Sequence, residues 1–350
     1  MKSFKIISTF SGCGGSSLGY KLAGGKILLA VEWDKNAVET YRLNFPDTDI
    51  YHGDISKLSV DEIITRTGIK VGELDIFDGS PPCQGFSTAG KRILNDPRNQ
   101  LFKEYIRILA GLKPKVFVME NVSGMVKGKM RLIFVEILKE LKSCGYNVKA
   151  KVLNAKYFNV PQSRERIIFI GVRNDLKLEP KHPKPKSKPI PIKNVIPSIK
   201  ALRSQQINPW IDSDKTAPTL CKTHVGYKGL PAFNDSYAKL WPRVPIGGSA
   251  ADVIGKGFNS CRKLDPKKVS NTLPKLQTGR GFATLCHPYE PRALTIDEAK
   301  IIGSFPENFK FIGSYSEQWA RIGNSVPPNF MKAIAEAIKT EILDKSENIN

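Results

Sequence analysis

The chain has 350 residues, 41% of them hydrophobic, which is ordinary for a globular protein with one large domain and a smaller one. Its 54 Lys and Arg residues against 33 Asp and Glu residues give a formal net charge of +21. Nucleic acid is therefore the first partner class to consider, and an anionic membrane surface the second. No apolar run approaches the roughly 20 residues that span a bilayer, and the N-terminal segment lacks the apolar core of a secretion signal. We expect an intracellular protein without a membrane partner.

The first half of the chain alternates apolar, strand-like runs with segments whose apolar residues have helical spacing. Such alternation predicts an α/β fold with a mostly parallel sheet covered by helices on both faces. The expected strands are 4–10, 27–33, 74–80, 115–122, 148–153 and 166–172. The expected helices are a stretch ending at Ala23, then 35–43, 100–112, 131–145 and a last helix over 330–343.

The composition changes at Glu179. The segment 179–193 contains five prolines and five lysines and predicts an extended linker, because proline removes backbone donors and like charges repel. From about 190 to 290 the chain is rich in Gly, Pro, Thr and Lys and has weak periodicity. We expect two domains: residues 1–180 completed by 315–350, and residues 181–314 including the linker.

Cysteine and histidine are too dispersed to indicate a metal site. The six cysteines form no CxxC pair, and the four histidines lie far apart along the chain. Neither pattern suits zinc or a disulfide framework. We therefore expect no metal, and each thiol is considered by its own surroundings.

A glycine cluster, FSGCGG, follows the first expected strand. Gly12, Gly14 and Gly15 let the backbone approach a ligand at a helix N-terminus. Glu32 lies 20 residues after Gly12, at the end of the next strand, where an acid can bind ribose hydroxyls. The dinucleotide-binding fingerprint is broken at Ser17, so this motif alone leaves a nucleoside-cofactor loop and a structural turn equally open.

The segment GSPPCQGFS, residues 79–87, comes directly after the expected strand 74–80. Its two prolines stiffen the approach to Cys83 and hold the thiol at the carboxyl edge of the sheet, where open α/β sheets bind ligands. Positive charge nearby would make such a thiol a nucleophile. A buried inert thiol is the commoner role for a single cysteine, but the surrounding prolines and glycines favour the nucleophile.

Two further motifs place charged groups at strand ends. Glu120 ends the apolar run of 115–122, where a carboxyl group is costly to bury and can protonate a substrate; capping of the next turn is the alternative. In QSRERIIFIG, Arg164 and Arg166 are expected on the same side of a strand start, where two guanidinium groups can bind a phosphate or a base carbonyl. A solvated strand edge would explain the arginines equally well if the motif stood alone.

These four motifs, in this order and spacing, resemble those of the DNA cytosine-5 methyltransferase family of bacterial and archaeal restriction–modification type. The resemblance covers residues 4–172 and 290–335. It implies a Rossmann-like methyltransferase sheet that uses S-adenosylmethionine, with a smaller, irregular target-recognition domain. One position departs from the family pattern, which often has Asp two residues before the aromatic residue of the glycine loop; here that residue is Ser8.

The resemblance also implies roles for individual residues. Cys83 is the nucleophile, Glu120 the acid, and Arg164 and Arg166 contact the cytosine. The implied S-adenosylmethionine site consists of Phe10, Gly12, Gly14, Gly15, Glu32, Trp33, Asp54, Ile55, Pro82, Asn324 and Ser325. The implied substrate-binding residues are Gln84, Ser87, Thr219, Leu220 and Arg280.

The reaction implied by the resemblance requires these residue types. Carbon 5 of cytosine is too electron-poor to attack a methyl donor, and a thiolate that adds at carbon 6 makes carbon 5 nucleophilic. An acid at N3 and an arginine at O2 offset the charge that develops in the ring. Because the base is shielded in a duplex, it must be flipped out. We therefore expect double-stranded DNA as partner, a cytoplasmic, nucleoid-associated monomer, and a cognate restriction endonuclease as a further partner to consider.

Three alternatives stay open. The RNA-directed branch of the same fold has a similar core and modifies transfer RNA, but the variable insert of roughly 100 residues favours DNA. A nucleotide-binding dehydrogenase is disfavoured by the broken third glycine and by the PPC and ENV motifs. A non-catalytic DNA-binding relative is disfavoured because Cys83, Glu120 and Arg166 are all present.

Overall fold

The computed structural model describes residues 3–82, 97–128, 130–201, 240–255, 261–279 and 282–347. Backbone contacts divide the chain into two compact units. The first consists of residues 1–158, 165–185 and 326–350, and the second of residues 159–164 and 186–325. The expected boundaries lay at 180 and 315, and the roles expected for the two domains stay predictions.

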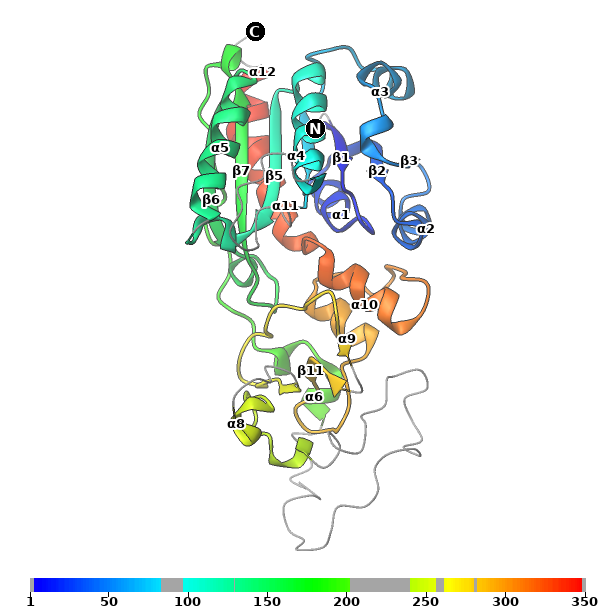
Figure 1. Ribbon diagram of the computed structural model, residues 1–350, viewed down its shortest axis with the longest axis vertical. Helices are drawn as coiled ribbons and strands as arrows, with labels where there is room; N and C mark the ends of the chain where they lie inside the picture. The colour runs from blue at the N-terminus through cyan, green and yellow to red at the C-terminus, as the bar shows by residue number, and fades with distance from the viewer. Residues whose placement is uncertain are drawn as a thin grey trace, which may run out of the picture. The chain divides into compact units, whose positions relative to one another are not determined.

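A seven-stranded sheet forms the centre of the first unit, in the strand order β3-β2-β1-β4-β5-β7-β6 (Figure 1). The strands from β1 to β5 are parallel, and β7 runs antiparallel between β5 and β6. The expected α/β fold with a mostly parallel sheet is confirmed. The order changes direction between β1 and β4, the point at which open α/β sheets bind ligands. The strands are β1 (Lys5–Thr9), β2 (Lys26–Glu32), β3 (Asp49–His52), β4 (Ile76–Gly79), β5 (Val116–Val122), β6 (Tyr146–Asn154) and β7 (Glu165–Arg173).

Helices cover both faces of this sheet. One face contributes Ile7, Leu29, Phe77 and Phe117 to a buried apolar cluster that also contains residues of α3, α4 and α5. Successive strand residues point to opposite faces, and Asp78, next to Phe77, contacts α1 on the other face. The helices of this unit are α1 (Gly15–Leu22), α2 (Lys35–Asn44), α3 (Val60–Thr67), α4 (Pro97–Leu112), α5 (Met130–Ser143), α11 (Pro328–Ile338) and α12 (Asp344–Glu347).

The helices α1 and α11 pack closely because α1 has a glycine at the contact. A Cβ atom on Gly19 would lie 2.6 Å from Met331 Cβ and 2.7 Å from the Pro328 carbonyl oxygen. Any side chain at this position would push α11 away. The C-terminal segment therefore completes the same sheet unit that the N-terminal residues begin.

The second unit has little regular structure. Each of its described strands is two residues long: β8 (Arg262–Lys263) pairs with β11 (Leu285–Cys286), and β9 (Thr278–Gly279) pairs with β10 (Phe282–Ala283). A small apolar cluster includes Trp241, Cys261 and Cys286, and Lys263 Nζ lies 3.7 Å from the centroid of the Trp241 ring. Its helices are α6 (Pro197–Ala201), α8 (Ala251–Ile254), α9 (Ile296–Ile302) and α10 (Tyr315–Asn324).

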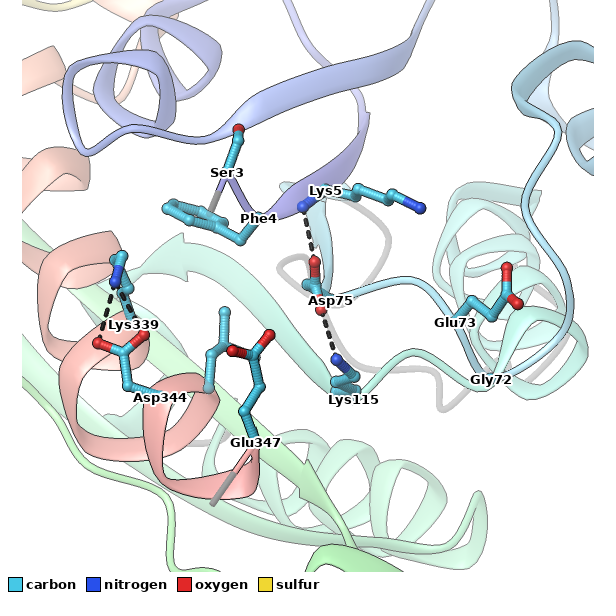
Figure 2. Close-up of a pocket in the computed structure, with 11 residues that line it drawn as sticks. Ser3, Phe4, Lys5, Gly72, Glu73, Asp75, Lys115, Lys339, Asp344 and Glu347 are labelled. Atoms are coloured by element: carbon cyan, nitrogen blue, oxygen red, sulfur yellow. Dashed lines mark hydrogen bonds and ion pairs between the residues drawn. The ribbon is translucent and has the colours of Figure 1, made fainter. Parts of the chain in front are cut away.

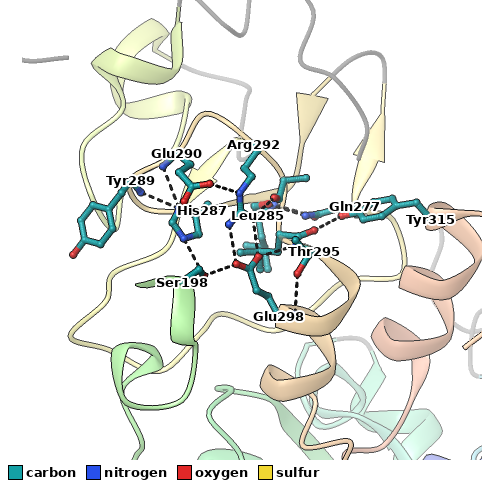
Figure 3. A network of polar contacts seen from close by, with 12 residues as sticks. Ser198, Gln277, Leu285, His287, Tyr289, Glu290, Arg292, Thr295, Glu298 and Tyr315 are labelled. Atoms are coloured by element: carbon teal, nitrogen blue, oxygen red, sulfur yellow. Dashed lines mark hydrogen bonds and ion pairs between the residues drawn. The ribbon is translucent and has the colours of Figure 1, made fainter. Parts of the chain in front are cut away.

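A buried polar network supports the start of α9 (Figure 3). The Arg292 guanidinium donates to both carboxyl oxygens of Glu298 at 2.8 Å, and Ser198 Oγ donates to Glu298 Oε1 at 2.6 Å. Thr295 and Glu298 form a reciprocal capping box at the first turn. His287 Nδ1 accepts hydrogen bonds from two backbone N–H groups of the following turn, at 3.1 and 3.3 Å.

The sequence pattern missed several short elements, β3 and α3 among them. The edge strand β3 is only four residues long and has one fully buried residue, Ile50. In α3, Ile63 alone is fully buried. Short elements with a single core residue show too little periodicity to be recognised. Within the expected linker, residues 179–193, there is no helix or strand before Ile192, where a short 3-10 helix begins. The linker is nevertheless held to the first unit, because His182 Nε2 lies 2.9 Å from the Ile168 carbonyl oxygen of β7.

Candidate active site

The glycine cluster forms a tight turn between β1 and α1. Phe10, Gly12 and Gly14 all have positive φ angles, of 54°, 54° and 97°. A Cβ atom on Gly14 would lie 2.3 Å from the Phe45 ring, so this position requires glycine. A Cβ atom on Gly12 would meet nothing within 4 Å, so the loop faces open space there. Gly15 begins α1.

Glu32 ties this turn to the end of β2. Its Oε2 accepts the backbone N–H of Gly12 at 2.8 Å, and its Oε1 accepts those of Trp33 and Asp34 at 2.9 Å. The Glu32 residue is 9% exposed, whereas the neighbouring Trp33 side chain is 78% exposed. The structure therefore brings the predicted acid and the predicted glycine loop together, with an exposed indole beside them.

Asp54 lies just beyond the end of β3, which is paired with β2. The exposed carboxylate caps a single helical turn by accepting the Ser56 N–H at 2.9 Å, and this hydrogen bond lowers the pKa of Asp54. The next residue, Ile55, is buried in the apolar cluster of the first unit. The Gly53 N–H donates to the Glu32 carbonyl oxygen at 3.1 Å. The predicted residues of β1, β2 and β3 thus meet at one edge of the sheet.

The described part of the segment GSPPCQGFS ends at Pro82, which is exposed, whereas Pro81 is buried. Asn121 Nδ2 donates to the Pro81 carbonyl oxygen at 3.0 Å, so β5 fixes the backbone that leads to Cys83. Sequence reasoning gave Asn121 no role, although it stands in the ENV motif. Six predicted residues lie outside the described residues: Cys83, Gln84, Ser87, Thr219, Leu220 and Arg280.

Glu120 and Arg166 form an ion pair across the adjacent strands β5 and β7. The distance from Arg166 Nε to Glu120 Oε1 is 2.7 Å, and the two side chains are 15% and 10% exposed. Arg166 Nη1 also donates to the Glu165 carbonyl oxygen at 2.7 Å. This arrangement places an acid and a cation side by side at the carboxyl end of β5.

Arg164 has different surroundings. It precedes β7, belongs to the second unit and is 3% exposed. Its Nη2 donates to the Gly323 carbonyl oxygen at 2.9 Å and its Nη1 to the Leu273 carbonyl oxygen at 3.3 Å. Arg164 and Arg166 therefore have different partners in this structure, because Arg166 pairs with Glu120. A cytosine contact by Arg164 stays a prediction.

The last predicted cofactor residues follow α10 or end it. Asn324 is exposed, and Ser325 Oγ donates to the Arg321 carbonyl oxygen at 2.7 Å. Gly323 packs so closely that a Cβ atom would lie 2.2 Å from the Pro274 carbonyl oxygen. Gly323 therefore has a packing role within the second unit. The cofactor role of Asn324 and Ser325 stays a prediction.

Asp78 is a buried acid that sequence reasoning missed. It is 2% exposed, and burial raises its pKa to about 7. Ser8 Oγ donates to its Oδ2 and the Tyr20 hydroxyl to its Oδ1, each at 3.0 Å. An acid in the apolar strand LDIFDGS, five residues before Cys83, was a visible signal.

A pocket of about 620 Å³ lies at the opposite edge of the sheet, near the amino ends of β1, β4 and β5 (Figure 2). Asp75 there accepts the backbone N–H of Lys5 and the ammonium of Lys115, each at 2.8 Å. Lys339 pairs with Asp344. None of the predicted site residues lines this pocket. Two ion pairs, Lys115 with Asp75 and Lys339 with Asp344, thus line this pocket.

The described residues contain neither a candidate metal site nor a helix that could cross a membrane. They contain no group of three or more His, Cys, Asp and Glu side chains placed to hold a metal ion. Within the same ranges, no helix has the length and apolar character needed to cross a membrane.

The chain is similar to known methyltransferases along nearly its whole length. The family model described as C-5 cytosine-specific DNA methylase matches residues 4–340. The type II methyltransferase M1.HphI of Haemophilus parahaemolyticus is 35% identical over 342 residues, which cover 96% of this chain and 87% of that protein. M.NgoPII of Neisseria gonorrhoeae is 35% identical over 345 residues, covering 96% and 95%.

Solved structures show the same similarity. An E. coli prophage protein described as a DNA modification methyltransferase superposes with a TM-score of 0.73 and 27% identity, over 97% of this chain and 100% of that one. A variant of Spodoptera frugiperda DNMT2 has the same fold, with a TM-score of 0.65 and 23% identity, over 96% and 99% of the two chains.

Proposed function

Because the chain belongs to the C-5 cytosine-specific DNA methylase family, we propose that it methylates carbon 5 of a cytosine flipped out of a specific duplex DNA sequence. The methyl group comes from S-adenosylmethionine, and the reaction passes through a covalent adduct between Cys83 and carbon 6. DNA cytosine-5 methylation is the family's activity, and its relatives M1.HphI and M.NgoPII are named type II methyltransferases. We extend a restriction–modification role to this chain on that basis.

The observation that carries the mechanism is the Glu120–Arg166 pair, next to the strand end that leads to Cys83. A thiolate that adds at carbon 6 pushes electron density toward N3 and O2 of the ring. Arg166 contacts Glu120 Oε1, so the proton that Glu120 donates to N3 is assigned to Oε2. The Arg166 guanidinium is assigned as the hydrogen-bond donor to O2. Both groups stabilise charge that appears only as the adduct forms, which is where electrostatic stabilisation accelerates a reaction.

The residues at the ends of β1, β2 and β3 fit an adenosyl cofactor. A carboxylate has about four acceptor positions, and three backbone N–H groups bind Glu32, which leaves capacity for a ribose hydroxyl. The exposed Trp33 ring offers an apolar surface for the adenine, and the exposed Asp54 carboxylate an acceptor for its amino group. S-adenosylmethionine supplies an electrophilic methyl group on a sulfonium centre. Phe10, Gly12 and Pro82 complete the proposed site.

The second unit is the proposed reader of the DNA sequence. Its irregular backbone and numerous lysines are suited to groove and phosphate contacts, and the net charge of +21 favours a polyanion. Thr219, Leu220 and Arg280 stay its proposed specificity residues, and Gln84 and Ser87 the proposed contacts beside Cys83. One active site is sufficient for flipping and transfer, so a monomer, with or without a cognate endonuclease, is the proposed form.

Bisulfite sequencing of DNA from cells that express the chain tests the function and its target together. We expect one recurring sequence with a protected cytosine in cells expressing the wild type and none with Cys83→Ser. Glu120→Gln retains the shape of the side chain but loses the proton at N3, and we expect its rate to fall about 100-fold.

Purified protein with labelled S-adenosylmethionine provides the complementary test. Label should enter duplex DNA and be absent from transfer RNA. Label in transfer RNA alone would contradict the proposed substrate, and methylation that survives Cys83→Ser would contradict the covalent mechanism.

A further inference from the structure

The Asp78 carboxyl group is buried, and none of the described residues places a cation against it. In the part of the chain that the structure describes, no Lys, Arg or His forms an ion pair with it. Its direct contacts are two hydroxyl groups, Ser8 Oγ at 3.0 Å and the Tyr20 hydroxyl at 3.0 Å. Burying a carboxyl group with so little compensation is expensive, and a core position would be filled more cheaply by an apolar residue.

Both hydroxyl partners flank the proposed cofactor loop. Ser8 stands on β1, two residues before Phe10, and Tyr20 stands on α1, the helix that follows the glycine cluster. Ser8 and Asp78 are register partners on adjacent parallel strands. Position 8 is also where the family pattern often has Asp. In this chain position 8 is Ser, and its hydroxyl donates to the Asp78 carboxyl group on the neighbouring strand.

The backbone of Asp78 is fixed as well, and it leads to the nucleophile. Thr9 Oγ1 donates to the Asp78 carbonyl oxygen at 3.0 Å. A Cβ atom on the next residue, Gly79, would lie 2.4 Å from Thr9 Oγ1 and 2.7 Å from the Tyr105 ring. The last residues of β4 are therefore held closely, five residues before Cys83.

We propose that Asp78 is a positioning residue, whose carboxyl group joins the strand leading to Cys83 to the two elements that flank the cofactor loop. This inference rests on the proposed function. Asp78 touches neither the cytosine nor the cofactor. It sets the relative placement of the cofactor loop and the nucleophile, so its removal weakens cofactor binding and slows the first turnover together.

The matched pair Tyr20→Phe and Tyr146→Phe separates positioning from general stability. Each variant removes a buried hydroxyl and leaves the ring. Tyr20 donates to Asp78, whereas Tyr146 donates to the Pro114 carbonyl oxygen, far from the site. We expect similar losses of melting temperature in the two variants. We expect only Tyr20→Phe to raise the calorimetric Kd of S-adenosylmethionine, by about 10-fold.

Asp78→Ser and the exchange Ser8→Asp/Asp78→Ser test the carboxyl group itself. Asp78→Ser should weaken cofactor binding and slow single-turnover methylation, each by at least about 10-fold. The double variant moves the carboxyl group from position 78 to its register partner, position 8. We expect it to recover at least half of the lost cofactor affinity on a logarithmic scale. A folded Asp78→Ser protein with Kd and rate within twofold of the wild type would overturn the inference.

Hydrogen exchange of the protein without cofactor gives a readout independent of activity. In Tyr20→Phe, amides 10–20 should exchange faster than in the wild type, whereas in Tyr146→Phe they should not. Equal exchange in both variants overturns the inference even if Asp78→Ser fails to fold. A wild type that neither binds S-adenosylmethionine nor methylates DNA contradicts the proposed function instead, and the exchange result still stands.

Discussion

The two units each bury a carboxyl group, and they hold it in opposite ways. Asp78 in the first unit receives hydrogen bonds from two hydroxyl groups, and burial raises its pKa to about 7. Glu298 in the second unit is also desolvated, but two hydrogen bonds and the charge of Arg292 outweigh that effect and lower its pKa to about 2. The pKa of the buried carboxyl group is thus raised in one unit and lowered in the other.

The difference follows from what surrounds each group. The first unit has a large apolar core and a continuous sheet, so it can tolerate one poorly compensated acid near its proposed site. The described strands of the second unit are two residues long, so side-chain bonds such as those of Glu298 must supply more of its order. Four predictions test this contrast, from the largest expected effect to the smallest.

Removing Arg292 should have the largest effect on stability. Arg292→Met leaves Glu298 buried without its partner, which costs about 3–5 kcal/mol. The control, Arg66→Met, breaks a pair with Asp49 whose side chains are 35% and 41% exposed and should cost about 0–1 kcal/mol. Urea denaturation measures both. Similar losses of unfolding free energy in the two variants would show that the Arg292–Glu298 network does not stabilise the second unit.

Removing Arg166 should affect the reaction more than the fold. Arg166→Met takes the cation away from Glu120, and we expect single-turnover methylation to slow about 100-fold, or about 3 kcal/mol in activation free energy. Arg173→Met, at the other end of β7, loses a pair with Asp175 and should keep its rate within about threefold. Quench-flow kinetics with labelled cofactor decides, and equal rates in both variants would remove Arg166 from the mechanism.

The stability contribution of Asp78 should fall as the pH rises. An unfolded Asp titrates near pH 3.9, whereas burial places the pKa of Asp78 at about 7, so the folded protein binds the extra proton between these values. The contribution is therefore complete below about pH 4 and is lost as the pH rises through 7, by about 2–3 kcal/mol between pH 5 and 8. The charge of Glu120, on β5, also raises the pKa of Asp78, whereas the hydrogen bonds from the Ser8 and Tyr20 hydroxyls lower it. Tyr105 of α4 interacts electrostatically with Asp78 as well.

Denaturation of Asp78→Asn measures this effect, because the amide does not titrate. As the pH rises from 5 to 8, the unfolding free energy of the wild type should fall relative to that of Asp78→Asn. A difference that stays constant over this range would contradict the raised pKa of Asp78.

His287 should make the second unit respond to pH in the opposite direction. Burial, with the charge of Arg292, lowers the pKa of His287 to about 4, and its Nδ1 must stay unprotonated to accept two N–H groups. The unfolded chain binds the extra proton between about pH 4 and 6.5, so stability is lost as the pH falls, by about 2 kcal/mol from pH 7 to 5.

Hydrogen exchange at matched pH, compared between wild type and His287→Gln, can assign that loss to the second unit. We expect the amides of α9 to lose protection at pH 5 in the wild type relative to the variant. Equal protection at both pH values would indicate that His287 does not limit the acid stability of this unit.

The amino-acid sequence determined most of the first unit, because its signals are local. The apolar runs and the glycine loop each form within one strand–turn–helix step, so their order along the chain predicts the sheet and the edge at which Gly12, Glu32 and Glu120 lie. Glu120 and Glu32 were predicted in the same way, as acids at strand ends.

Only the tertiary structure decided which of these groups act on one another. Arg164 and Arg166 are two residues apart, yet one binds backbone carbonyls of the second unit and the other binds Glu120. The partners of Asp78 lie 58 and 70 residues away in the sequence. A contact of this kind depends on strand order and register, which no local pattern encodes, and it decides whether a buried acid keeps its proton.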